Sequence, residues 1–142
     1  MNPKDTFVRG FSARTVRWVA LLFVCAAYLQ GGLTKALAFN GAVAEMAHFG
    51  LQPAVPMAIA TIVVELGAAV LILSGYRRWF GALALAAFTA GATFVANRFW
   101  ELPMAQQTMA ANTFFEHIGL VGAFLLIAWH DLADSAHRRG AP

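Results

Sequence analysis

Residues 60–73 read ATIVVELGAAVLIL, an apolar run interrupted by one hydroxyl group, Thr61, and one carboxylic acid, Glu65. About 20 residues of this kind cross the roughly 30 Å hydrocarbon core of a bilayer as a helix. A charged side chain at that depth costs about 2.5–3.5 kcal/mol on insertion scales. We therefore expect Glu65 to be protonated, paired or in contact with cavity water, and to face other helices rather than lipid.

The composition of the chain is that of a membrane protein. Hydrophobic residues make up 60% of the 142 residues and charged residues only 12%, whereas a soluble domain carries about 25% charged residues. The net charge of +3 is modest and does not point to nucleic acid, so the lipid bilayer is the expected partner. The single cysteine, Cys25, excludes an internal disulfide and a self-sufficient Cys-x-x-Cys catalyst.

Four apolar runs are long enough to span a bilayer, at about residues 15–34, 54–73, 79–96 and 112–130. Strands of a membrane barrel would be shorter and would alternate. The predicted fold class is therefore all-α, a bundle of four transmembrane helices that forms one domain over residues 1–142. The first outer loop contains NGAVAEMAHFGLQP, in which apolar residues fall near one helical face. It predicts a short interfacial helix.

Lysine and arginine residues fall mostly on one side of the expected bundle. Eight of the ten lie in the two tails or in the turn between the second and third helices: Lys4, Arg9, Arg14, Arg17, Arg77, Arg78, Arg138 and Arg139. Cytoplasmic loops carry an excess of these residues. We expect a multi-pass protein of the bacterial inner (plasma) membrane with both termini in the cytoplasm.

Polar residues of all four expected helices gather in the outer half of the membrane. They are Tyr28, Gln30 and Lys35 on the first helix, Glu65 on the second, Asn97, Arg98 and Glu101 at the end of the third, and Glu116 and His117 on the fourth. Lys35 and Glu65 differ in depth by about 15 Å on helix rise, so we expect water or a ligand between them rather than direct contact.

Structural alternatives remain open for several of these residues. The position of Lys35 at a helix end fits a snorkelling side chain as well as it fits a ligand-binding group. Arg98 with Glu101 also fits an ion pair at the rim, and His117 also fits a hydrogen-bonded core histidine. Small residues at Gly119 and Gly122, and at Ala82, Ala86 and Ala90, predict helix packing.

Three stretches resemble the DoxX family of four-helix membrane proteins, over roughly residues 14–130. LQGGLTKALAFNG resembles its Gly-x-x-Lys signature, here Gly32 and Lys35, and VVELGAAVLILSGYRRWFGALAL resembles its second-helix acid followed by a basic turn. FFEHIGLVGAFLL resembles its fourth helix, with Glu116-His117 where many members have Lys-Asn. The resemblance implies the fold and, for some members, similarity to subunits of membrane-bound thiosulfate:quinone oxidoreductases. Fold alone does not fix function.

The first hypothesis for the function is a membrane subunit of a quinone-linked redox complex. A quinone head group needs acid and base partners beside an apolar slot. We expect Glu65, Glu116 and His117 to be the catalytic acid/base groups, and Tyr28, Gln30 and Lys35 to bind the quinone. No haem or metal is expected, since His117 and His130 lie near opposite ends of the fourth helix. A partner would have to supply the oxidant, the reductant or a sulfur-handling site. We expect association with a protein partner or as a homo-oligomer.

Two further hypotheses stay open, and with them whether the protein is an enzyme. In a non-catalytic anchor or assembly subunit, Lys35, Glu65 and Glu116 would fix the register of the helices. A small proton-coupled exporter is less favoured. Four-helix multidrug transporters also use one mid-membrane glutamate, but theirs lies in the first helix and Glu65 lies in the second.

Overall fold

The computed structural model describes residues 14–140, with side chains described as far as residue 137. Its elements are α2 Arg14–Leu37, α3 Phe39–His48, α4 Ala54–Ser74, α5 Arg78–Ala96, the 3-10 turn η1 Phe99–Glu101 and α6 Met104–Gly140. Four helices, α2, α4, α5 and α6, are long and apolar enough to cross a membrane. The all-α prediction is confirmed, and α3 is the short helix predicted in the first loop. The predictions for Lys4, Arg9, Arg138 and Arg139 lie outside the described side chains.

The last helix is longer than predicted. The sequence indicated residues 112–130, whereas α6 runs for 37 residues from Met104 to Gly140. At 1.5 Å per residue it is about 55 Å long, which exceeds the roughly 30 Å of hydrocarbon. Pro103 predicts a helix start that leads directly into the fourth helix, and this is confirmed, since α6 begins at Met104. The polar residues at the two ends of α6 are compatible with a helix that continues into water beyond each membrane surface.

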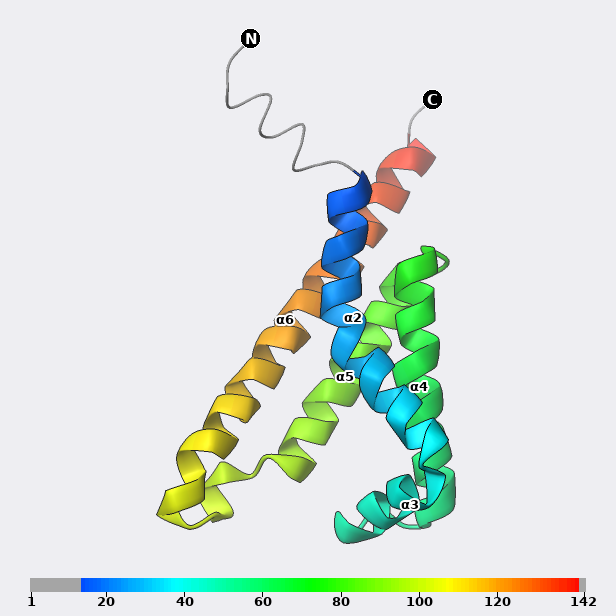
Figure 1. The fold of residues 1–142 in the computed structure, drawn as a ribbon. Coiled ribbons are helices and arrows are strands. Elements are labelled where there is room, and N and C mark those ends of the chain that lie inside the picture. The colour runs from blue at the N-terminus through cyan, green and yellow to red at the C-terminus, as the bar shows by residue number, and fades with distance from the viewer. Residues whose placement is uncertain (1–13, 141–142) are drawn as a thin grey trace.

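The helices are arranged so that the start of α2, the α4–α5 turn and the last part of α6 share one end of the bundle, here called the basic end (Figure 1). In the bundle, α4 packs against α2 and α5, α6 packs along α5, and α3 lies on α4. At the opposite end, α6 and the end of α5 diverge from α3 and the start of α4 (Figure 1).

Close packing near the basic end depends on small residues. A Cβ atom at Gly81 would lie 2.7 Å from the Ala68 carbonyl oxygen and 2.9 Å from Leu71 Cβ, so only glycine allows this approach of α4 and α5. Ala82 and Ala86 are buried, as predicted. The prediction for the glycines of α6 is wrong.

No atom lies within 4 Å of a Cβ built at Gly119 or Gly122. The helix instead buries Phe124 and Ala128. At about 100° per residue, Gly122 lies about 160° around the helix from Phe124, so it faces away from that contact. The two glycines therefore make no helix–helix contact in the described part of the chain.

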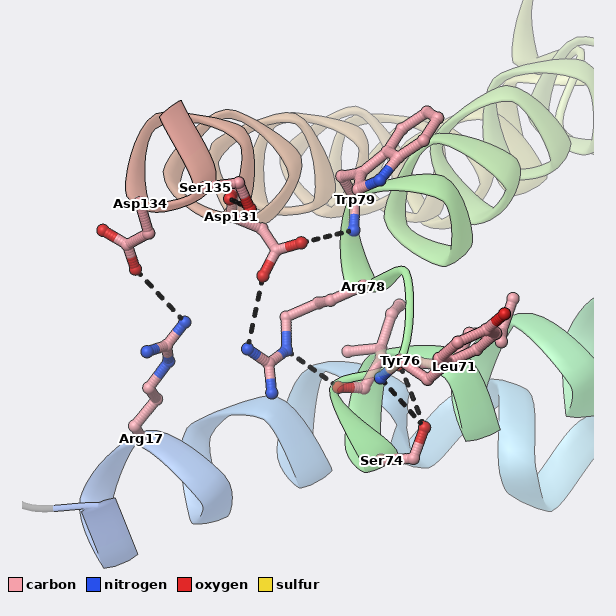
Figure 2. A network of polar contacts seen from close by, with 10 residues as sticks. Arg17, Leu71, Ser74, Tyr76, Arg78, Trp79, Asp131, Asp134 and Ser135 are labelled. Carbon is pink, nitrogen blue, oxygen red and sulfur yellow. Dashed lines mark hydrogen bonds and ion pairs between the residues drawn. The ribbon is translucent and has the colours of Figure 1, made fainter. Parts of the chain in front are cut away.

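A polar clamp closes the turn between α4 and α5 (Figure 2). Arg78 donates from Nε to the Ile72 carbonyl oxygen at 2.9 Å, and its Nη1 lies 3.5 Å from Asp131 Oδ1. The Trp79 amide donates to Asp131 Oδ2 at 3.2 Å. The Asp131 carboxylate thus satisfies an N–H group at the start of α5, where negative charge is favoured.

Candidate intramembrane binding site

A cavity of about 520 Å³ lies toward the opposite end of the bundle. Its wall is contributed by α2, α3, α4, α5 and α6, and is mostly apolar or glycine. The polar side chains on the wall are Tyr28, Lys35, Glu45, Thr61, Glu65, Thr89 and His117. A cavity with few polar groups on an apolar wall is the usual form of a small-molecule site.

An ion pair between Lys35 and Glu65 lies on this wall. Lys35 Nζ is 3.2 Å from Glu65 Oε1 and 3.4 Å from Oε2, and the two side chains are 18% and 8% exposed. Among the described residues, the Glu65 carboxylate accepts hydrogen bonds only from Lys35. The acid at mid-depth is therefore paired and faces the bundle, as the sequence indicated.

The expectation that Lys35 and Glu65 do not touch is wrong. The difference in depth was counted from the predicted helix ends, whereas a Cβ atom built at Gly32 would lie 3.2 Å from Glu65 Cβ. Glu65 is therefore level with Gly32, only about 5 Å along α2 from Lys35. In addition, Cα–Cβ bonds tilt toward the N-terminus of their own helix. Because α2 and α4 run in opposite directions, the two side chains lean toward each other. The long lysine side chain covers the remaining distance.

Small residues make room for the pair. A Cβ atom at Gly31 would lie 3.6 Å from Lys35 Nζ and 3.7 Å from Glu65 Oε2, which places the pair directly over the surface of α2. On α4, the neighbours Thr61 and Ala68 are buried together with Glu65. The face of small residues predicted around the acid is confirmed.

The Tyr28 hydroxyl is fixed on the same wall by α5. It lies 2.5 Å from Thr89 Oγ1, which itself donates to the Leu85 carbonyl oxygen at 2.6 Å. Since the threonine proton is used in that bond, Tyr28 is the donor to Thr89. The tyrosine ring packs edge-on against Phe124 of α6, with ring centroids 5.3 Å apart.

His117 is oriented by two side chains of α5. Its Nδ1 lies 2.6 Å from Thr93 Oγ1 and 3.2 Å from Asn97 Nδ2. An amide nitrogen can only donate, so Nδ1 is an acceptor and the ring proton belongs on Nε2. The role of Thr93 was missed in the sequence, although its spacing of four from Asn97 places both on one face of the helix.

Two of the candidate residues lie outside the cavity. Gln30 is exposed and donates to Thr34 Oγ1 at 3.1 Å, and Glu116 is exposed. Neighbouring residues on a helix point about 100° apart, so His117 and Glu116 cannot both face the cavity. Of the six candidates, the structure brings together Tyr28, Lys35, Glu65 and His117.

The third-helix cluster divides between the site and the rim. Arg98 and Glu101 form an exposed ion pair at 3.2 Å, each side chain being 51% exposed, which is the rim alternative left open by the sequence. Asn97 instead contacts His117. Glu45, on α3, also lines the cavity, a position that the helical periodicity of the loop did not indicate.

The chemical groups on the wall suit a polar head group attached to an apolar body. Lys35 and the His117 Nε2–H group can donate to oxygens, the Tyr28 hydroxyl oxygen can accept, and the Glu65 carboxylate can take up and release a proton. In the part of the chain that the structure describes, no group of three or more His, Cys, Asp or Glu side chains could hold a metal ion.

Comparisons with known proteins agree with the architecture. The DoxX family model matches residues 16–98, more than half of the chain. The inner membrane protein YphA of Escherichia coli (strain K12) is 28% identical over 130 residues, which cover 90% of this chain and 91% of YphA. No solved structure matches. The segment matched by the family model contains Tyr28, Lys35 and Glu65, whereas His117 lies beyond it.

Proposed function

The chain belongs to the DoxX family of membrane proteins, and we propose that within this family it is the quinone-binding membrane subunit of a redox complex. The observation that carries the proposal is the Lys35–Glu65 ion pair, which shares one cavity with Tyr28 and His117. The name of YphA supports a place in the inner membrane. The basic end supports an orientation with both termini in the cytoplasm.

A quinone fits this cavity in size and in chemistry. The volume of about 520 Å³ falls within the roughly 300–1,000 Å³ of small-molecule pockets. The quinone oxygens would accept hydrogen bonds from Lys35 and from the Nε2–H group of His117, and the ring would lie against apolar wall residues such as Phe88 and Leu120. The tail would leave the bundle toward lipid.

Reduction of a quinone to a quinol takes up two electrons and two protons. In the proposed role, a redox protein bound to this subunit supplies the electrons, and the Glu65 carboxylate takes up each proton from water before it passes the proton to a quinone oxygen. The His117 Nε2–H group donates a hydrogen bond to a quinone oxygen. Lys35 balances the charge of the Glu65 carboxylate, which makes the acid tolerable at this depth while keeping it next to the ligand.

The test compares Glu65, which lines the cavity, with Glu116, which is exposed outside it. In membranes that contain the full complex, Glu65→Gln is expected to lower quinone reduction about 100-fold, the usual scale for loss of a positioned acid or base. Glu116→Gln makes the same chemical change on an exposed side chain and should leave turnover within about twofold. Unchanged turnover in Glu65→Gln, at equal amounts of protein in the membrane, would remove the proposal.

A non-catalytic anchor subunit is the second candidate, and one observation favours it. The Lys35–Glu65 pair joins α2 to α4 directly, as a contact that fixes helix register would. In that role Glu65→Gln lowers the abundance of the protein, and quinone reduction per assembled complex stays constant. A variant that is fully abundant and inactive would rule this second candidate out.

A further inference from the structure

A second cavity, of about 390 Å³, lies between α2 and α6 at the basic end. It shares no lining residue with the cavity at Glu65. Its lining residues are Arg17, Ala20, Leu21 and Val24 of α2, Arg78 of α5, and Ala123, Leu126, Ile127, His130 and Asp134 of α6. The polar members come from three helices and are far apart in the sequence.

The polar residues collect at one end of this cavity. Arg17 and Arg78 both point toward the acids of α6 (Figure 2). Arg78 is held by Asp131 and by the Ile72 carbonyl oxygen. Arg17 lies 3.9 Å from Asp134, and the two side chains are 52% and 51% exposed. That distance is longer than a hydrogen bond, so the Arg17 guanidinium can turn toward an anion without losing a strong contact.

The rest of the cavity is an apolar strip. It runs from Ala20 to Val24 on α2 and from Ile127 to Ala123 on α6. From Arg17 to Val24 the rise is about 10 Å, and from Asp134 to Ala123 it is about 16 Å. A ligand that fills the cavity would therefore have a polar head at the end of the bundle, among Arg17, Arg78 and Asp134, and an apolar chain that points toward the membrane centre.

The polar end of the cavity lies at the level of the membrane surface. Trp18 follows the lining residue Arg17 in the sequence, and Trp129 precedes the lining residue His130. These two tryptophans are 48% and 61% exposed. Tyr76, in the turn beside Arg78, is 65% exposed. Exposed aromatic residues of this kind mark the head-group region of a bilayer, where the phosphates of the same leaflet lie.

The two helices that flank the cavity pack mainly on other partners. α2 packs against α4, and α6 packs against α5. The described contacts between α2 and α6 include the exposed Arg17–Asp134 pair and the Tyr28–Phe124 ring contact. A molecule in the cavity would complete the interface between the first and last helices of the bundle.

We propose that this cavity binds one anionic glycerophospholipid, with its phosphodiester on Arg17 and Arg78 and one acyl chain along the apolar strip. Guanidinium groups bind phosphate in a bidentate manner and are weakly hydrated, which suits an interfacial site. His130 lines the same end and can donate to a phosphate oxygen. Basic pockets between transmembrane helices on the cytoplasmic side are a known form of lipid site.

The experiment is native mass spectrometry of the full-length protein in detergent, titrated with phosphatidylglycerol or with phosphatidylcholine. The wild-type protein is expected to retain one phosphatidylglycerol in preference to phosphatidylcholine. Arg17→Gln should weaken phosphatidylglycerol binding about tenfold, the effect of one charge-assisted hydrogen bond. Arg14→Gln, at the same end but outside the cavity lining, and Arg98→Gln, in the exposed pair at the opposite end, should bind as the wild type does.

A second variant tests the apolar strip without changing charge. Ala20 is exposed and lines the cavity, so Ala20→Trp fills the strip without replacing a core residue, and it should also release the lipid. Equal retention of the two lipids, or phosphatidylglycerol binding that survives both Arg17→Gln and Ala20→Trp, would overturn the proposal. Displacement of the lipid by millimolar inorganic phosphate would identify a free-anion site instead and would overturn it as well.

Discussion

Two ion pairs with similar burial lie in the two halves of this bundle, and their surroundings differ. Arg78 and Asp131, at the basic end, are 17% and 13% exposed; Lys35 and Glu65, on the larger cavity, are 18% and 8% exposed. The Asp131 carboxylate also accepts the Trp79 amide, and Arg78 also donates to a carbonyl oxygen. Among the described residues, the Glu65 carboxylate has hydrogen bonds from Lys35 alone.

The number of hydrogen-bond partners separates the Arg78–Asp131 pair, which has a structural role, from the Lys35–Glu65 pair, which is open to a ligand. The Arg78–Asp131 pair closes a turn and starts a helix, so loss of either charge there would destabilise the fold. The Lys35–Glu65 pair instead lines a cavity, where a ligand can supply the missing partners. Burial alone therefore does not distinguish the two carboxylates, whereas unfilled hydrogen-bonding capacity beside a cavity does, and on that ground Glu65 is the candidate for ligand binding.

The largest expected loss of stability comes from a change in the Arg78–Asp131 pair. Asp131→Ala leaves the Arg78 guanidinium without its counter-charge and the Trp79 amide without its acceptor, and should lower the free energy of unfolding by about 3 kcal/mol. Thermal unfolding in detergent measures it. The matched change Glu101→Ala, in the exposed rim pair, should cost less than about 1 kcal/mol. Equal losses in the two variants would remove the distinction between a closed clamp and a surface pair.

Two glycines of α5 compare the packing of the basic end with the packing around the larger cavity. Gly81→Ala places a methyl group 2.7 Å from the Ala68 carbonyl oxygen and should destabilise the protein by about 2 kcal/mol, since α4 and α5 must separate. Gly91 lines the larger cavity, and no atom lies within 4 Å of a Cβ built there. Gly91→Ala should change stability by less than about 1 kcal/mol. A large loss for Gly91→Ala would show that the cavity region is packed as tightly as the basic end.

A double-mutant cycle on the cavity pair gives the smallest expected change in stability. Lys35→Gln and Glu65→Gln each leave one charge without its partner, and the double variant removes both charges. We expect a coupling free energy of about 1 kcal/mol, so that the double variant is more stable than the sum of the single losses indicates. Thermal unfolding of the four proteins measures it. A coupling near zero would mean that the two side chains do not stabilise the fold through each other.

Much of the architecture could be predicted from hydropathy. Runs of about 20 apolar residues have no stable place outside a bilayer, and a single acid within one of them has to face the bundle. The extent of α6 could not be predicted in this way. Hydropathy detects only the part of a helix that lies in hydrocarbon, and both ends of α6 are polar.

The depth of the candidate site in the membrane could be predicted from the sequence, but the contacts among its side chains could not. The concentration of polar residues toward one half of the membrane placed Tyr28, Lys35, Glu65 and His117 in one region. The choice between His117 and Glu116 depends on the rotation of α6 about its axis, which one sequence does not fix. The contact of Lys35 with Glu65 depends on the relative level of α2 and α4, which places Glu65 beside Gly32, and on the direction of side chains along antiparallel helices. A count of helix rise from predicted helix ends gives neither.

Binding of a quinone to the purified protein tests the role of Glu65 most directly. A short-chain ubiquinone analogue is titrated into the detergent-solubilised wild type, Glu65→Gln and Glu116→Gln, with thermal unfolding confirming that each protein is folded. The wild type and Glu116→Gln should bind with the same Kd, and Glu65→Gln about tenfold more weakly, because Lys35 loses the carboxylate that positions its ammonium group for the quinone oxygen. A folded Glu65→Gln protein that binds the quinone as tightly as Glu116→Gln would contradict the placement of the ligand at the Lys35–Glu65 pair.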